Sequence, residues 1–437
     1  MYQEISDLFM YGDLDTDSIL YKIGEIIREF DSGEYEKTKL IREIKTELKR
    51  LLALATDYGF DKNLWHNYIA FFVMMNENPF SLVCEKNRIN EGTVTQIVQE
   101  DFSSIRKIFL YDFSKIENEL GINSFSLISN YNAVEKKKNI YNWNVSQKVQ
   151  KLSKELEEAT DDKEFYERII QFYDDFGVGL FGLNKAFRIE ETPNDGIRFK
   201  AINNMDMVVL DDLVGYEIQK KKLIDNTEAF VKGCKANNVL LFGDSGTGKS
   251  TSIKAIVNQY YDSGLRMIEI YKHQFKHLST IISTIKNRNY KFIIYMDDLS
   301  FEENEIEYKF LKAVIEGGVE TKPDNVLIYA TSNRRHLIKE SWNDKEDHTN
   351  IDDIHHSDTV EEKLSLVHRF GVTIGYTKPA QKEFMNIVIT LARRAGIEME
   401  ESELKLEANK WELSHGGISG RTAQQFVNYL LYQQEMY

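Results

Sequence analysis

Residues 239–254 read VLLFGDSGTGKSTSIK, in which an apolar run leads into a glycine-rich loop. The run at 239–242 is typical of a short buried strand, and Ile253, Ile256 and Val257 then recur at helical spacing. The loop at 243–250 fits the pattern Gly-x-x-x-x-Gly-Lys-Ser, whose small residues allow backbone N–H groups to surround a phosphate. We therefore predict a strand, a phosphate-binding loop and a helix. The predicted phosphate-binding residues are Gly243, Asp244, Ser245, Gly246, Thr247, Gly248, Lys249, Ser250 and Thr251.

Carboxylates follow a second apolar run, KFIIYMDDLS at 291–300. Lys249 of the loop is predicted to reach the β- and γ-phosphates, and the Ser250 hydroxyl to bind Mg²⁺. In-line phosphoryl transfer also needs a carboxylate on the metal side and a group that orients water. We assign Asp297 to the Mg²⁺ shell and Asp298 to the attacking water. The alternative is a strand-end turn with two solvated aspartates.

A third apolar run, NVLIYATSNRR at 325–335, ends in polar residues. Ligands of open α/β sheets lie at the carboxyl ends of strands, so Asn333 is predicted to hydrogen-bond the γ-phosphate or the water. A simple strand cap is the competing interpretation. Arg369 in SLVHRFG and Arg421 in GGISGRTAQQF are, on these residues alone, ordinary surface arginines.

The chain is predicted to divide into a helical N-terminal domain at 1–190, a linker at 191–204, an α/β core at 205–377 and a helical region at 378–437. Apolar stripes such as Ile44, Leu48 and Leu51 mark the helices of the first part. The linker is placed at ETPNDGIRFKAINN, where proline and glycine stand among polar residues. Beyond it, strand-like runs alternate with helical segments, which predicts a five-stranded parallel sheet. These runs lie at 239–242, 266–271, 291–296, 325–330 and 371–376.

Composition excludes several classes of protein. The 437 residues are 42% hydrophobic and 29% charged, as in an ordinary globular chain of two or three domains. No apolar run is long enough to span a bilayer, no signal peptide is evident, and the two cysteines form no metal or disulfide pattern. We therefore expect a cytoplasmic protein. The net charge of −15 argues against broad nucleic-acid binding.

Two charged clusters have a less specific meaning. The run Lys136, Lys137 and Lys138 is a candidate basic patch, although a solvated helix face is the simpler interpretation. The histidines His348, His355 and His356 stand among many acids, but their spacing fits no known metal site. We expect an acidic loop there.

From residue 205 onward, the order of these segments resembles the AAA+ ATPase superfamily. GDSGTGKS is similar to Walker A, FIIYMDD to Walker B and TSN to sensor 1. HRFG resembles the arginine-finger segment and SGR looks like sensor 2, which implies that Arg369 acts on a neighbouring subunit and that Arg421 lies on a helical lid. DDLVGYEIQKK at 211–221 resembles the segment that wraps adenine, with Val214, Gly215 and Tyr216 in the contact positions.

More narrowly, EEKLSLVHRFG resembles a bacterial AAA+ family catalogued as a domain of unknown function, with a helical N-terminal half and an AFRI-like segment, here at 186–189. The resemblance implies ATP and Mg²⁺ as cofactors and a ring-type homo-oligomer, for which six subunits are expected. One departure is Asp298, because most members of the superfamily have glutamate there. This departure favours slow turnover and a switch-like role, although members of the initiator and helicase-loader types also carry Asp-Asp, so that it does not exclude activity.

The leading hypothesis is an ATPase that remodels or loads a macromolecule, either protein or nucleic acid, held by the helical half. The alternative is an ATP-gated binding or scaffold protein with little or no hydrolysis. A small-molecule kinase is disfavoured by the sensor, finger and lid segments.

Overall fold

The computed structural model describes residues 1–85, 92–133, 142–193, 196–203, 205–302, 305–316, 323–335, 337 and 366–436. The chain forms two compact units. The helical unit comprises Met1–Asn184 and Ala201–Asn204, and the α/β unit comprises Lys185–Lys200 and Met205–Tyr437. The lysine run at 136–138 and the three histidines at 348, 355 and 356 lie outside the described residues.

The helical unit is built around α4 (Leu64–Met75). Its sequence, LWHNYIAFFVMM, is apolar on every side, as expected of a helix surrounded by others. The other helices of the unit are α1 (Tyr2–Ser6), α2 (Ile19–Ser32), α3 (Lys37–Tyr58), α5 (Pro79–Cys84), α6 (Thr93–Phe109), α7 (Ser114–Leu120), α8 (Ser124–Ser129), α9 (Trp143–Glu157), α10 (Asp162–Phe176) and α11 (Gly179–Leu183). The predicted stripe on α3 is confirmed, since Ile44, Leu48 and Leu51 are buried in the core.

A buried carboxylate fixes the N-terminal segment of this unit. Asp101 on α6 accepts hydrogen bonds from the backbone N–H groups of Phe9, Met10 and Tyr11, at 2.8, 2.7 and 3.0 Å. The Tyr11 hydroxyl in turn lies 2.8 Å from that of Tyr173 on α10. Charge-assisted bonds of this kind compensate for the loss of hydration of the carboxylate, so the first residues are held against α6.

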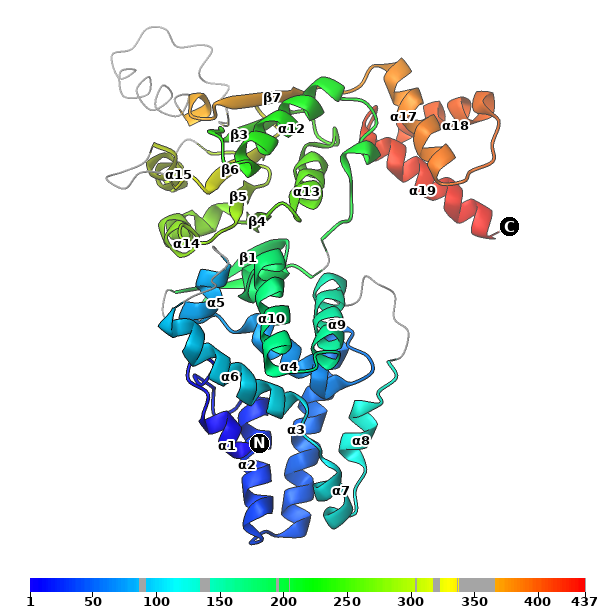
Figure 1. Cartoon of the computed structure of the whole chain (residues 1–437). Coiled ribbons are helices and arrows are strands. Elements are labelled where there is room, and N and C mark those ends of the chain that lie inside the picture. The colour runs from blue at the N-terminus through cyan, green and yellow to red at the C-terminus, as the bar shows by residue number, and fades with distance from the viewer. Residues whose placement is uncertain are drawn as a thin grey trace. The chain divides into compact units, whose positions relative to one another are not determined.

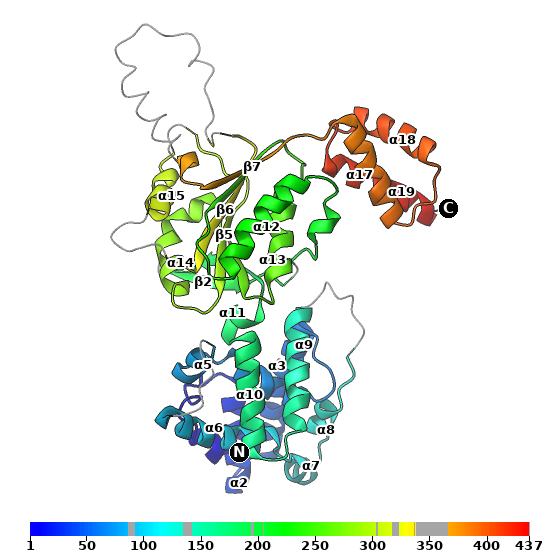
Figure 2. The same cartoon turned by 45° about the horizontal axis from the view of Figure 1, so that its top comes forward.

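The α/β unit contains one sheet, whose strands in the described residues run in the order β2-β1-β4-β5-β6-β3-β7. The five predicted strands are all present, as β3 (Val239–Gly243), β4 (Leu265–Glu269), β5 (Lys291–Met296), β6 (Val326–Ser332) and β7 (Val372–Tyr376). They pair in parallel with one another. Helices α12 (Glu217–Val231) and α13 (Lys249–Tyr260) lie on one face, and α14 (Leu278–Ile285) and α15 (Glu307–Glu316) lie on the other (Figures 1 and 2). The predicted α/β fold class is confirmed.

The sheet has two strands more than predicted, β1 (Ala186–Glu191) and β2 (Ile197–Ala201). β1 pairs in parallel with β4, with Ala186 opposite Met267. The segment at 191–204 that we interpreted as a linker therefore contains the whole of β2 and the turn that precedes it. Its proline and glycine mark a turn between two short strands, and burial of Ala186, Phe187 and Ile189 shows that β1 is part of the core.

The C-terminal helices form a small core of their own. α17 (Gln381–Arg394), α18 (Glu401–Ser414) and α19 (Gly420–Met436) pack together through residues such as Phe384, Val388 and Phe426. Val214, from the segment before α12, packs against the same core. Two short 3₁₀ helices, at Leu210–Asp212 and Lys272–His277, complete the described elements of this unit.

The end of β3 allows no side chain. Gly243 has a φ of +131°, and a Cβ atom placed there would lie 1.9 Å from the carbonyl oxygen of Tyr376 on β7. That carbonyl accepts a hydrogen bond from the N–H of Asp244 at 3.0 Å. The sharp turn from strand to loop thus depends on glycine and on the close approach of β7.

We predict that Gly243→Ala destabilises the α/β unit severely, by about 3 kcal/mol or more, because backbone atoms cannot move aside as a flexible side chain can. Gly33→Ala is the matched control, since Gly33 also has a positive φ, of +73°, but an added Cβ meets nothing within 4 Å. The control should cost only about 1 kcal/mol. Urea unfolding of both variants measures the difference, and equal losses would contradict the prediction.

Candidate active site

The loop between β3 and α13 has the backbone of an anion-binding turn. Gly246 and Gly248 have φ values of +76° and +92°, and α13 begins at Lys249 directly after them. The N-terminal N–H groups of this helix point into the loop, together with the positive end of the helix dipole. A Cβ atom at Gly248 would lie 2.9 Å from the side chain of Leu213, which precedes α12. The shape of the loop therefore depends on its glycines and on its packing against Leu213.

Lys249 is buried in the loop, with only 7% of its surface exposed. Its Nζ donates to the carbonyl oxygens of Gly243 at 2.9 Å and Asp244 at 2.6 Å, and to Oδ1 of Asn333 at 3.0 Å. Burial lowers the pKa of Lys249, and the positive charge of Arg421 acts in the same direction while nearby aspartates oppose it. The ammonium group therefore lies beside the carboxyl ends of β3 and β6.

Asn333 joins this lysine to Asp298. An ammonium group can only donate hydrogen bonds, so the amide oxygen of Asn333 faces Lys249. The Nδ2 of Asn333 donates to Oδ1 of Asp298 at 2.7 Å. Asp298 itself has a φ of +50°, a conformation that few residues other than glycine adopt. Backbone strain of this kind is concentrated at functional sites.

Asp297 accepts two hydroxyl hydrogen bonds at one oxygen. Ser250 Oγ donates to its Oδ1 at 2.8 Å and Thr331 Oγ1 donates at 2.5 Å. Burial would raise the pKa of Asp297, but the hydroxyls of Thr331, Tyr295 and Ser250 outweigh it and hold the pKa below the ordinary value. Asp297 is thus ionised near neutral pH, between the loop and the end of β6.

These oxygens fit Mg²⁺, which prefers hard oxygen ligands and is usually bound by one or two carboxylates with phosphate and water. Ser250 Oγ and the Asp297 carboxylate are the two protein groups in position. Within the part of the chain that the structure describes, no group of three or more His, Cys, Asp or Glu side chains could hold a metal. Any resident cation here would therefore need ligands from a bound phosphate.

The segment predicted to contact adenine lies beside the loop and the C-terminal helices. Gly215 and Tyr216 have φ values of +84° and +59°. The Tyr216 hydroxyl donates to the carbonyl oxygen of Thr377 at 2.8 Å, and its ring centroid lies 5.1 Å from that of Tyr376. Burial raises the pKa of Tyr216 to about 12. With Val214 packed on the C-terminal core, this segment connects the sheet to α17–α19.

Arg421 lies at the loop as well. Its backbone N–H donates to the carbonyl oxygen of Gly246 at 3.2 Å, at the start of α19. Its charge contributes to lowering the pKa of Lys249, so its guanidinium is within electrostatic reach of the ammonium group. The structure thus brings the C-terminal helices and the phosphate-binding loop together.

Arg369 does not join this cluster. It is exposed and precedes β7, whose Val372 pairs with Val239 and whose Tyr376 pairs with Gly243. Arg369 therefore lies beyond the amino end of β7, while the loop lies at the carboxyl end. At about 3.3 Å per residue, the strand alone separates them by roughly 13 Å.

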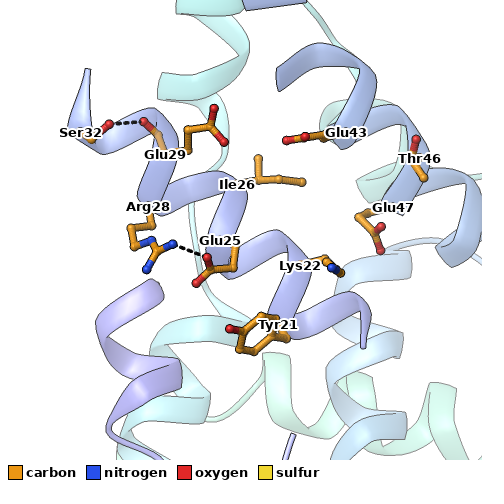
Figure 3. Close-up of a pocket in the computed structure, with 10 residues that line it drawn as sticks. All are labelled: Tyr21, Lys22, Glu25, Ile26, Arg28, Glu29, Ser32, Glu43, Thr46 and Glu47. Atoms are coloured by element: carbon orange, nitrogen blue, oxygen red, sulfur yellow. Dashed lines mark hydrogen bonds and ion pairs between the residues drawn. The ribbon is translucent and has the colours of Figure 1, made fainter. Parts of the chain in front are cut away.

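A surface hollow of about 720 Å³ lies elsewhere, between α2 and α3 of the helical unit (Figure 3). Glu25, Glu29, Glu43 and Glu47 surround it, with Arg28 paired to Glu25. It holds charges of both signs and is open to solvent, so it has none of the features of a catalytic site.

Two residues of the site were not assigned from the sequence. Thr331 holds Asp297 and also accepts the N–H of Asp298 at 2.9 Å. Tyr295 on β5 lies next to Asp297 and Ser250. Thr331 is a polar residue at the end of an apolar run, and this position could have indicated a site residue. Tyr295 stands within an apolar run, so the sequence pattern does not distinguish it from a core residue.

Comparisons with known proteins find a matching family model and similar solved structures. A family model described as "Protein of unknown function (DUF815)" matches residues 183–434. Among solved structures, the Thermotoga maritima RuvB Holliday junction branch migration motor is 17% identical, with a TM-score of 0.36, over 52% of this chain and 65% of that one. The FIGL-1 AAA domain in complex with ADP is 18% identical, with a TM-score of 0.35, over 51% of this chain and 72% of that one.

The chain thus spans just under two thirds of the RuvB chain. No curated protein matches it, and none of its described helices is long and apolar enough to cross a membrane. Since the family model covers more than half of the residues, the chain belongs to the DUF815 family.

Proposed function

We propose that this protein binds ATP with Mg²⁺ and hydrolyses it to ADP and phosphate within an assembly of several copies, in order to remodel or load a macromolecular partner. The observation that carries the proposal is the hydrogen-bonded chain from Lys249 through Asn333 to Asp298, at the carboxyl ends of three neighbouring strands. Lys249 would bind a phosphate, Asn333 would contact the γ-phosphate, and Asp298 would hydrogen-bond the attacking water.

Binding of the triphosphate would use the loop at 243–251. Its N–H groups and the start of α13 favour the negative charge, and Lys249 would transfer its hydrogen bonds from carbonyl oxygens to phosphate oxygens. The adenine would lie against Val214, Gly215 and Tyr216, between the sheet and the C-terminal helices. Arg421, at the start of α19, would add positive charge near the γ-phosphate.

Hydrolysis would depend on Asp298 and Asn333. Asp298 would accept a hydrogen bond from the attacking water, and its bond to Asn333 fixes the direction of the carboxylate. Ser250 and Asp297 would hold Mg²⁺, which would supply positive charge beside the transferred phosphoryl group.

Arg369 is proposed to complete the site of a neighbouring copy. Its position beyond the amino end of β7 places it away from its own loop, while its exposure leaves it accessible to another subunit. The AAA+ resemblance supports a ring, for which we propose six copies. We propose a cytoplasmic setting, in which the free Cys84 and Cys234 would remain reduced.

The helical unit is proposed to hold the partner. It has its own core, separate from that of the C-terminal helices, and none of the described residues that we assign to the site belongs to it. The second candidate function is an ATP-gated scaffold with little hydrolysis, which the aspartate at position 298 and its strained backbone favour.

Hydrolysis per subunit should rise steeply with protein concentration, because the site is complete only between copies. We expect Arg369→Ala to lower the rate by about 10³-fold or more while leaving ATP binding intact. Mixing it with Lys249→Ala subunits should restore activity, since these supply the arginine to an intact loop. Phosphate release over a wide concentration range measures both effects.

Arg393→Ala, an exposed arginine on α17, is the matched control and should leave the rate unchanged. A rate that is independent of concentration and close to zero, despite tight ATP binding, would exclude the motor and favour the scaffold.

Asp298→Glu separates the two candidates further. The added methylene moves the carboxylate away from its 2.7 Å contact with Asn333, and misplacement by about 1 Å can cost roughly 10²-fold in rate. We therefore expect a 10- to 100-fold fall in turnover with unchanged ATP affinity. A large gain would instead show that the native residue keeps the site slow, as the scaffold requires.

A further inference from the structure

A second hollow of the helical unit has an apolar floor. It measures about 470 Å³ and lies between α3 and the segment formed by α8 and Tyr131. The floor includes Leu48 and Ile128, which are buried, and Leu127, which is 62% exposed. Because Leu127 is exposed beside buried apolar side chains, covering the hollow would remove apolar surface from water, which is favourable.

The edge of this hollow is basic. Lys45 and Lys49 on α3 line it and also line a neighbouring hollow of about 540 Å³, to which Arg42 belongs. The two hollows thus form one groove, which we call the α3–α8 groove. Lys39 and Arg50 of the same helix are paired with glutamates. The three cations of the groove are exposed, and none forms an ion pair with a residue that the structure describes.

The two sides of α3 differ in charge. Glu43 and Glu47, four residues apart, belong to the acidic hollow beside α2 (Figure 3). Arg42, Lys45 and Lys49 recur at intervals of three and four residues, so they share another side of the helix. In a chain with a net charge of −15, these unpaired cations form a local region of positive charge. Such a region attracts an acidic partner and guides its approach.

The groove has the length of a short helix. Ile41, Leu48 and Leu52 of α3 line it beside the basic side chains. From the first to the last of these positions α3 rises by roughly 17 Å, or about three turns. An amphipathic helix suits such a groove, because its backbone is already hydrogen-bonded and its side chains repeat every three or four residues. A nucleic acid fits less well, since phosphates would leave the apolar floor uncovered.

We propose that the α3–α8 groove binds an acidic amphipathic helix of a partner protein. The apolar side of that helix covers the floor around Leu127, and its carboxylates pair with Lys45 and Lys49. The proposal rests on the proposed function, because it gives the chemistry of the partner that the helical unit would hold. The contact itself uses no residue that we assign to the active site.

The test uses a fluorescein-labelled helical peptide of about 16 residues, with leucine along one face and glutamate beside it. Fluorescence anisotropy measures its affinity for the full-length chain. We expect Lys45→Glu/Lys49→Glu to weaken binding about tenfold or more, because two attractions become repulsions. Leu127→Ser should weaken it about tenfold through lost apolar contact. A peptide with glutamine in place of glutamate should bind the wild-type chain more weakly.

Lys107→Glu/Lys163→Glu is the matched control. These two exposed lysines lie on α6 and α10, and reversing them changes the net charge by the same amount. The control should leave the affinity within about twofold, because salt screens charges that do not touch the peptide. All the substituted side chains are exposed, so thermal unfolding should give melting temperatures close to that of the wild-type chain.

The proposal fails if the peptide does not bind, or if binding survives both Lys45→Glu/Lys49→Glu and Leu127→Ser. Equal binding of single-stranded DNA or of a leucine-free acidic peptide would also overturn it, by showing a general polyanion site. A change of oligomeric size in Lys45→Glu/Lys49→Glu without peptide would assign the groove to contacts between copies instead.

ATP hydrolysis by the same proteins distinguishes this proposal from the proposed function. Hydrolysis that rises with protein concentration, together with an unbound peptide, would remove the groove alone. A bound peptide without hydrolysis would remove the ATPase and leave the groove in place.

Discussion

The carboxylate of Asp297 is the group on which the arrangement of the site depends. It binds Ser250 at the start of α13 and Thr331 at the end of β6, and it stands at the end of β5 itself. Three elements are thereby fixed relative to one another through one oxygen atom. Removing it would leave two hydroxyl donors and the beginning of a helix without their common acceptor.

The loop is fixed from the other side by backbone contacts. The Tyr376 carbonyl accepts the N–H of Asp244, and the Gly246 carbonyl accepts the N–H of Arg421. Side-chain contacts on one side and backbone contacts on the other leave Lys249 with a single well-defined environment. A precise position for this ammonium group is what selective binding of a phosphate requires.

Much of this was predictable from sequence because it depends on local patterns. The loop motif, the five apolar runs and the carboxylates at 297 and 298 follow from spacing and from the rule that parallel strands end at one edge. The hydrogen bond from Asn333 to Asp298 was not predictable, since it depends on side-chain direction at the ends of two strands. Likewise, β1 and β2 were not predicted, because they lie in segments that we assigned to the helical domain at 1–190 and to the linker at 191–204. The proline and glycine between the two strands are as typical of a linker as of a turn.

β7 connects two places that serve different roles in the proposed assembly. One end follows Arg369, and at the other end the carbonyl of Tyr376 accepts the N–H of Asp244 in the loop. A short strand hydrogen-bonded along its length is stiff, so displacement at one end is transmitted to the other. If Arg369 acts on a neighbouring copy as proposed, occupancy of one subunit's site would alter the affinity of the next, and thermodynamic linkage would make that influence mutual. In the proposed ring, nucleotide cooperativity would then depend on a single β-strand.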